Sequence, residues 1–298
     1  PTLIWGLVNL LQMFFYLSFF NVDYPPNVKQ FLGLFGLGKL DFIPNIIGFL
    51  YDNLNKDPLE SPPHFQENGY TGLFLQSGGN MILICFLGLV LYFLSGILLK
   101  TFKRIPKTFK TILTKIRDNL EWSGLLRMWL STYFEIMFAA ILQVRVMNFR
   151  SPRNGVSSLM GLGVFIGNLC LPLLIYLIVK KHGTGKRTNQ ASNTSQKFST
   201  LFEGCKSTHP LCKYIYAVMI FRRLLQSMLI VFCYYDPLLQ TTLVLLLVGI
   251  STLIFVKFKP YTDARNNFIE GFSEACFFII HLVIRYLAAD DSSPEFSD

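Results

Sequence analysis

Charged residues are scarce in this sequence. Only 15% of its 298 residues are Asp, Glu, Lys or Arg, whereas 52% are hydrophobic and 29 are Phe. The mean hydropathy is +0.43. Because soluble domains carry about 25% charged residues, this shortage excludes an ordinary soluble domain and indicates that lipid solvates much of the chain.

The sequence contains several long runs of apolar residues. A hydrocarbon core of about 30 Å needs about 20 mostly apolar residues in a helix. We expect membrane spans at roughly 2–20, 80–99, 125–146, 157–179, 213–234, 238–258 and 268–287. A single run of this kind also suits the core of a large soluble protein, but seven in one chain predict an all-α, polytopic integral membrane bundle. The third and seventh runs carry charge.

Motifs for enzyme or cofactor chemistry are also lacking. The runs hold neither the paired aspartates, nor the His-Glu-x-x-His helix, nor the serine beside a histidine that intramembrane hydrolases use. The stretch GLFGLGK at 33–39 lacks the spacing of a phosphate-binding loop. Cys205, His209 and Cys212 lie close together, but no second ligand pair follows them. We therefore expect no enzyme, no cofactor and no metal.

Lys and Arg gather in alternate loops, and this pattern explains the net charge of +9 better than nucleic-acid binding does. The loops at 100–124 and 180–212 and the loop after the sixth run are basic. Because cytosolic loops are enriched in Lys and Arg, we expect all three in the cytosol, facing anionic lipid headgroups. The segment at 21–79 carries more acidic than basic residues and is expected on the other side.

This topology divides the chain into four parts. Residues 1–20 are the first transmembrane helix, 21–79 an extracytosolic segment, 80–290 a six-helix transmembrane bundle and 291–298 an acidic tail. The first run starts at residue 1 without the charged start and cleavage site of a signal peptide. We therefore expect the chain to be part of a longer protein.

Two features bear on the orientation. Arg145, Arg150 and Arg153 fall on the expected outer side, and if they stayed in the cytosol the third run would not cross fully. Asn193 begins an Asn-Thr-Ser sequon in a polar loop without periodicity. Because that loop is expected in the cytosol, we predict that Asn193 carries no glycan.

The stretch KTFKRIPKTFKTILTKIRDNLEW at 100–122 alternates basic and apolar residues directly after the second run. Two interpretations stand. The stretch forms an amphipathic helix at the headgroups, where its cations meet anionic lipid, or its positive charge only fixes the topology.

Ionisable residues inside the seventh run share one helical face. Glu270 and Glu274 are one turn apart, His281 is two turns beyond Glu274, and Arg285 is one turn further. Charged groups in a span are costly and usually face a bundle interior or a water-filled cavity. These four residues are a candidate intramembrane polar path.

A second polar stripe lies on the third run, with Arg127, Ser131, Glu135 and Gln143 at steps of four or eight.

The depth of Glu135 along its helix suggests an ion-pair partner on the fifth run. Glu135 comes about ten residues after Leu125, and Arg222 and Arg223 come about nine after Lys213, which is roughly 14 Å into the helix. Both helices are expected to enter from the cytosol, so Glu135 and the two arginines match in depth. We hypothesise an intramembrane ion pair between Glu135 and Arg222 or Arg223. Both stripes are equally explained as glue between helices and as a route for ions or protons.

Several stretches together carry a family resemblance: IWGLVNLLQMFFYLSFFNVDYPPNVKQFL, DFIPN, RMWLSTYFEI, RRLL and KPYTDARNNFIE. In this order the chain resembles the multi-span region of ciliate membrane proteins related to fungal-type TRP-like and polycystin-like proteins. In that family the arginine pair recurs, as do residues matching Gln240, Asn267 and Glu270. The chain has Ser273 where the family often has Asn before the next Glu.

The resemblance implies an integral protein of the plasma or ciliary membrane with an ion-channel or sensory role. A familiar tetrameric cation channel needs a pore helix and filter between its last two spans, but those runs are joined here by a short loop, and the fifth and sixth by 234–237 alone. We expect a TRP-like channel or sensory module for cations. The alternative is a structural, scaffold or receptor-like subunit without transport. Either would work in the lipid bilayer as a homo-oligomer or within a larger membrane assembly.

Overall fold

A computed structural model gives the fold and describes residues 10–36, 46–49, 61–101, 106–120, 122–182, 201, 204–206 and 209–290. The acidic tail at 291–298 and the sequon at Asn193 lie outside these residues. Within them the regular structure is helical: η1 Tyr16–Phe19, α2 Pro26–Leu34, α4 Pro63–Glu67, α5 Phe74–Ser77, α6 Gly79–Thr101, α7 Lys107–Leu120, α8 Trp122–Arg145, α9 Pro152–His182, α11 Pro210–Lys213, α12 Ile215–Phe232, α13 Pro237–Phe258 and α14 Ala264–Asp290.

Five of these helices are long and apolar enough to cross a membrane: α6, α9, α12, α13 and α14. They correspond to the second, fourth, fifth, sixth and seventh expected runs. The protein is therefore an all-helical, multi-pass integral membrane bundle, as the composition predicts. The structure does not confirm the count of seven. Of the first run, it describes only a shorter apolar helix at Leu10–Phe19.

The third expected run is α8, a helix of 24 residues at the centre of the bundle. Every residue from 131 to 143 is buried, and α8 packs against α6, α9 and α12. Because protein rather than lipid surrounds this part of α8, the helix can hold polar side chains that a lipid-facing span would exclude.

Local sequence signals set the ends of α13. Pro237 occupies the first turn, where its missing N–H costs no hydrogen bond. The carboxylate of Asp236 accepts a hydrogen bond from the backbone N–H of Leu239 at 2.9 Å, which caps the helix. The helix ends at Lys259, whose left-handed backbone (φ 44°) turns the chain toward α14.

A buried amide on α8 joins three helices. The Gln143 Oε1 atom accepts hydrogen bonds from the Phe74 backbone N–H at 2.9 Å and the Ser157 hydroxyl at 2.8 Å. Its Nε2 donates to the Ser158 hydroxyl at 3.1 Å. Gly161 lies against this side chain, so that a Cβ there would be 2.8 Å from the Gln143 Cγ. The close approach of α8 and α9 therefore depends on a residue without a side chain.

The N-terminal segment packs inside the bundle. Tyr16 stacks on Phe134 of α8, with ring centroids 4.3 Å apart. Asn21 binds α13 and the turn before it. Its backbone N–H donates to Gln240 Oε1 at 3.1 Å, and its side chain donates to the Tyr234 carbonyl at 2.9 Å. Residues 10–22 thus connect α8 with α13.

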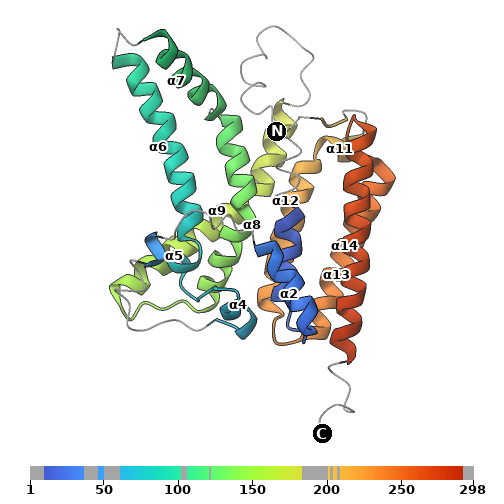
Figure 1. The fold of residues 1–298 in the computed structure, drawn as a ribbon. Helices are drawn as coiled ribbons and strands as arrows, with labels where there is room; N and C mark the ends of the chain where they lie inside the picture. Colours follow the sequence, from blue (N-terminus) through green and yellow to red (C-terminus); the bar gives the residue numbers. More distant parts are fainter. Residues whose placement is uncertain are drawn as a thin grey trace.

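The helices alternate in direction. The C-terminal ends of α6, α9 and α13 and the N-terminal ends of α7 and α14 lie at one end of the bundle, at the top of Figure 1, whereas α14 ends at the other. This is the end at which the three basic loops were expected, so the arrangement agrees with their common side. Assignment of that side to the cytosol stays a prediction, as do the domain limits at residues 20, 79 and 290.

Candidate functional site

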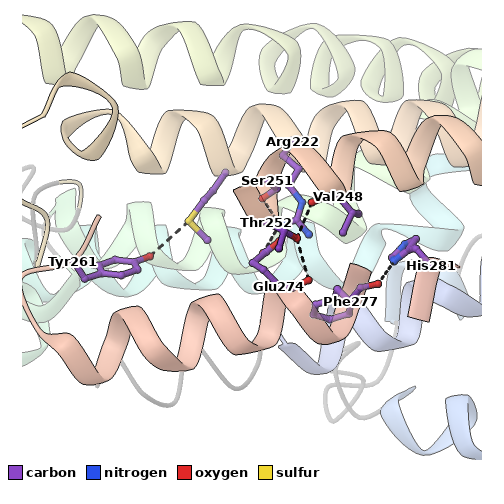
Figure 2. A network of polar contacts seen from close by, with 9 residues as sticks. Arg222, Val248, Ser251, Thr252, Tyr261, Glu274, Phe277 and His281 are labelled. Atoms are coloured by element: carbon purple, nitrogen blue, oxygen red, sulfur yellow. Dashed lines mark hydrogen bonds and ion pairs between the residues drawn. The ribbon is translucent and has the colours of Figure 1, made fainter. Parts of the chain in front are cut away.

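The candidate site is a buried polar contact between α12, α13 and α14 (Figure 2). The Arg222 Nη1 atom, on α12, donates hydrogen bonds to Glu274 Oε1 on α14 and to the Ser251 hydroxyl on α13, the latter at 2.9 Å. Arg222 and Ser251 are each 6% exposed and Glu274 is 5% exposed. The guanidinium of Arg222 therefore links α12 to both α13 and α14.

The contact lies deep in the candidate spans. Glu274 comes ten positions after Ala264, the first residue of α14, which places it about 15 Å along a helix that rises 1.5 Å per residue. Thr252 of α13 adds a hydrogen bond from its hydroxyl to the Glu274 carbonyl at 3.2 Å. A charged pair so far from water is stable only while both partners are present, because removing one leaves the other charge buried.

The two adjacent arginines face different helices. Residues one position apart on a helix point about 100° away from each other. Arg222 accordingly reaches α13 and α14, whereas the Arg223 Nη1 atom donates to the Leu130 carbonyl of α8 at 3.3 Å. Arg223 is 7% exposed. The pair thus connects the last three helices to the central helix α8.

The hypothesised pairing of Glu135 stays a prediction. Glu135 lies on α8 and is 3% exposed. The ion pair that the structure gives for Arg222 has Glu274 as its acid, a partner that the sequence argument did not assign. The depth argument used for Glu135 also applies to Glu274, because α12 and α14 both start at the same end of the bundle (Figure 1). Matching depth alone cannot choose between two carboxylates; the face of α12 that carries Arg222, directed toward Ser251 of α13 and Glu274 of α14, decides it.

His281 binds its own helix through one ring nitrogen. Its Nδ1 lies 2.7 Å from the Phe277 carbonyl oxygen, one turn earlier. Because a carbonyl only accepts, Nδ1 carries a proton and Nε2 is the bare acceptor in the neutral ring. The ring is 1% exposed and packs edge-on against Phe20, with centroids 5.6 Å apart.

The four residues of the expected polar path do not form one chain of contacts. Glu274 binds α12, His281 binds its own backbone, and the Arg285 Nε donates to the Thr242 hydroxyl of α13 at 2.6 Å. Glu270 is partly buried, one turn before Glu274. These contacts hold the side chains on one helix but direct them to three different partners.

Two loops pair at the basic end of the bundle, and we call the contact of residues 205–206 with residues 260–261 the clasp. An isolated antiparallel bridge pairs Cys205 with Tyr261. Next to it the Lys206 N–H donates to the Pro260 carbonyl at 2.8 Å. The Asn267 side chain fixes the turn by accepting from the Tyr261 N–H at 2.8 Å and donating to its carbonyl at 2.7 Å. Gln240 of α13 has a similar role, because its Nε2 donates to the Ile230 carbonyl at 2.7 Å.

Burial makes one thiol of this clasp less acidic than a free cysteine. Burial raises the pKa of the Cys205 thiol to about 12, with a smaller contribution from Cys212. The Cys212 thiol lies 3.6 Å from the Phe258 carbonyl. No group of three or more His, Cys, Asp or Glu side chains in the described part of the chain is arranged to hold a metal ion.

Comparison with protein-family models, curated proteins and solved structures finds no match to this chain. The fold and site define a multi-pass helical membrane protein with a buried ion pair.

Proposed function

We propose that this chain is a structural or receptor-like subunit of a membrane assembly, without enzymatic activity and without an open path for ions. The observation that carries the proposal is the contact of Arg222 with both Ser251 and Glu274, all three of them buried. A conducting protein needs its ionisable groups beside a hydrated route, whereas a scaffold holds them paired and dry. The contacts of this site favour the second arrangement.

Exposed apolar side chains support the assembly part of the proposal. Phe86, Phe93 and Ile97 of α6 are 59%, 62% and 58% exposed, and Phe268 and Phe272 of α14 are 71% and 61% exposed. Such surfaces are suited to lipid or to another transmembrane helix. The resemblance to polycystin-like proteins favours the plasma or ciliary membrane for this assembly.

A TRP-like cation channel or sensory module is the second candidate. One observation favours it: Glu270, Glu274 and His281 follow one another on a single helix, and Glu274 is held by one ion pair. A gating motion that separates α12 from α14 would release the carboxylate and line a route with it. In this case the ion pair would stabilise the closed state of the channel.

Cation flux into liposomes that contain the purified protein separates the two candidates. The scaffold proposal predicts no flux above empty liposomes for the wild type or for Glu274→Gln. A channel predicts flux in the wild type that Glu274→Gln abolishes or makes more selective. Glu67→Gln is the matched control, because Glu67 is an exposed carboxylate on the short helix α4. Flux that depends on Glu274 but not on Glu67 would overturn the proposal.

A further inference from the structure

Helix α7 is amphipathic and follows directly after the lipid-exposed span α6. At about 100° per residue, its apolar side chains fall in a stripe about 100° wide: Phe109, Ile112, Leu113, Ile116 and Leu120. Such a stripe is typical of a helix with one buried face.

The protein buries only part of this stripe. Leu113 is 7% exposed, where α7 packs against α6 and α8. Phe109 and Ile112 are each 49% exposed. Both lie outside the candidate spans, so the protein alone leaves large apolar side chains open at the end of the bundle.

Basic residues flank the stripe on both sides. Relative to Phe109, Lys110 and Arg117 lie about 80–100° to one side and Lys115 about 120° to the other. The helix has four basic residues and one acidic residue in total. This pairing of an apolar stripe with flanking cations is complementary to an anionic membrane surface.

The position of α7 in the fold supports the same occupant. The helix begins at the end of the bundle where α9 ends and α14 begins, and it is inclined to α6 (Figure 1). Helix α6 is the least buried of the five candidate spans and so has the largest share of its surface open to lipid. Lipid next to α6 would therefore reach α7 without any further protein between them.

We propose that α7 is an interfacial helix that binds the anionic leaflet at the basic end of the protein. Phe109 and Ile112 enter the boundary between headgroups and acyl chains, and Lys110, Lys115 and Arg117 bind phosphate and carboxylate groups of the lipid. This binding site is independent of whether the protein conducts ions. It requires only that the bundle lies in a membrane.

Photo-crosslinking from two neighbouring positions tests the proposal in the full chain. Ile112 and Thr114 are both exposed and point about 160° apart on the same helix. A benzophenone amino acid at position 112 is expected to crosslink to lipid in liposomes of 30% phosphatidylserine, whereas the same amino acid at 114 is expected to give at least fivefold less. Equal yields at both positions, or crosslinks from position 112 to a second copy or another protein, would overturn the proposal.

Neutralisation of the flanking cations tests the charge requirement. In the variant Lys110→Gln/Lys115→Gln/Arg117→Gln, we expect the ratio of anionic to zwitterionic lipid crosslinked at 112 to fall, by about fivefold for each charge removed. High salt should lower the ratio in the wild type as well. Lys110 and Lys115 are exposed and Arg117 is half-buried. An unchanged elution profile checks that the bundle is intact. An unchanged lipid ratio with an intact bundle contradicts the electrostatic part.

Discussion

The contact between Arg222 and Glu274 gives the sharpest prediction on stability. Glu274→Gln keeps the size of the side chain but leaves the Arg222 guanidinium, 6% exposed, without a counter-charge. Breaking a buried ion pair by removing one partner costs about 3–5 kcal/mol. Arg222→Gln should cost a similar amount, because it leaves the carboxylate of Glu274 buried. Each substitution alone should therefore lower the free energy of unfolding by about 3–5 kcal/mol.

A double substitution separates this cause from general damage to packing. Arg222→Met combined with Glu274→Leu removes both charges, and apolar replacements of a buried pair are often nearly neutral. We expect the double variant to lie within about 1.5 kcal/mol of the wild type. Reversible unfolding in mixed micelles, followed by circular dichroism, measures all three variants. The exposed Glu67→Gln is the control and should change stability by less than about 0.5 kcal/mol.

Two results would refute this reasoning. Single substitutions that cost less than about 1 kcal/mol would show that the pair is solvated or is not formed. A double variant at least as unstable as either single substitution would show that lost packing, rather than an uncompensated charge, causes the destabilisation.

Three further predictions concern packing, the clasp and thiol chemistry. Gly161→Ala should destabilise the protein by about 1–3 kcal/mol, because the new Cβ would lie 2.8 Å from the Cγ of Gln143. Gly163→Ala should not destabilise it, because a Cβ there has no neighbouring atom within 4 Å. Thermal unfolding compares the two variants. Asn267→Ala removes three hydrogen bonds to the backbone and should cost about 1–3 kcal/mol, whereas the exposed neighbour Asn266→Ala should cost less than about 0.5 kcal/mol. Equal effects of the two substitutions would rule out the clasp. Burial raises the pKa of Cys205 from 9.0 to about 12, so the thiol should react with a maleimide at pH 8 about a thousandfold more slowly in the folded than in the unfolded protein. The contribution of the neutral thiol to stability is complete below about pH 9 and should be lost as the pH rises toward 12. Mass spectrometry of the labelled peptide measures the rate, and equal rates in the folded and unfolded protein would contradict the burial.

The positions of the long helices could be predicted from the sequence because hydrophobicity and length suffice for a membrane span. The expected run at 238–258 agrees with α13, Pro237–Phe258, where a proline and an aspartate also mark the start. The short helices α4 and α5 were not predicted. They are four or five residues long, and such short segments show no usable periodicity.

The partners of the polar residues could be predicted only in part. Sequence spacing correctly placed Glu274 and His281 on one buried face of α14, since a helix fixes that geometry by itself. It could not predict that Arg222 binds Glu274, because two carboxylates lie at a suitable depth and the choice depends on which helices pack together. The role of Asn267 likewise depends on a turn that brings its amide to the Tyr261 backbone.

We expect the ion pair between α12 and α14 to be free of water. Ser251→Cys places a thiol next to the Arg222 guanidinium, at the hydroxyl that the arginine contacts at 2.9 Å. A positively charged, membrane-impermeant methanethiosulfonate reagent is applied to either side of liposomes, and mass spectrometry locates the modified residues. Tyr235→Cys, at a site 77% exposed, is the positive control. Position 235 should be modified and position 251 should not. Rapid modification of position 251 from either side would reveal water at the ion pair and would contradict a dry contact.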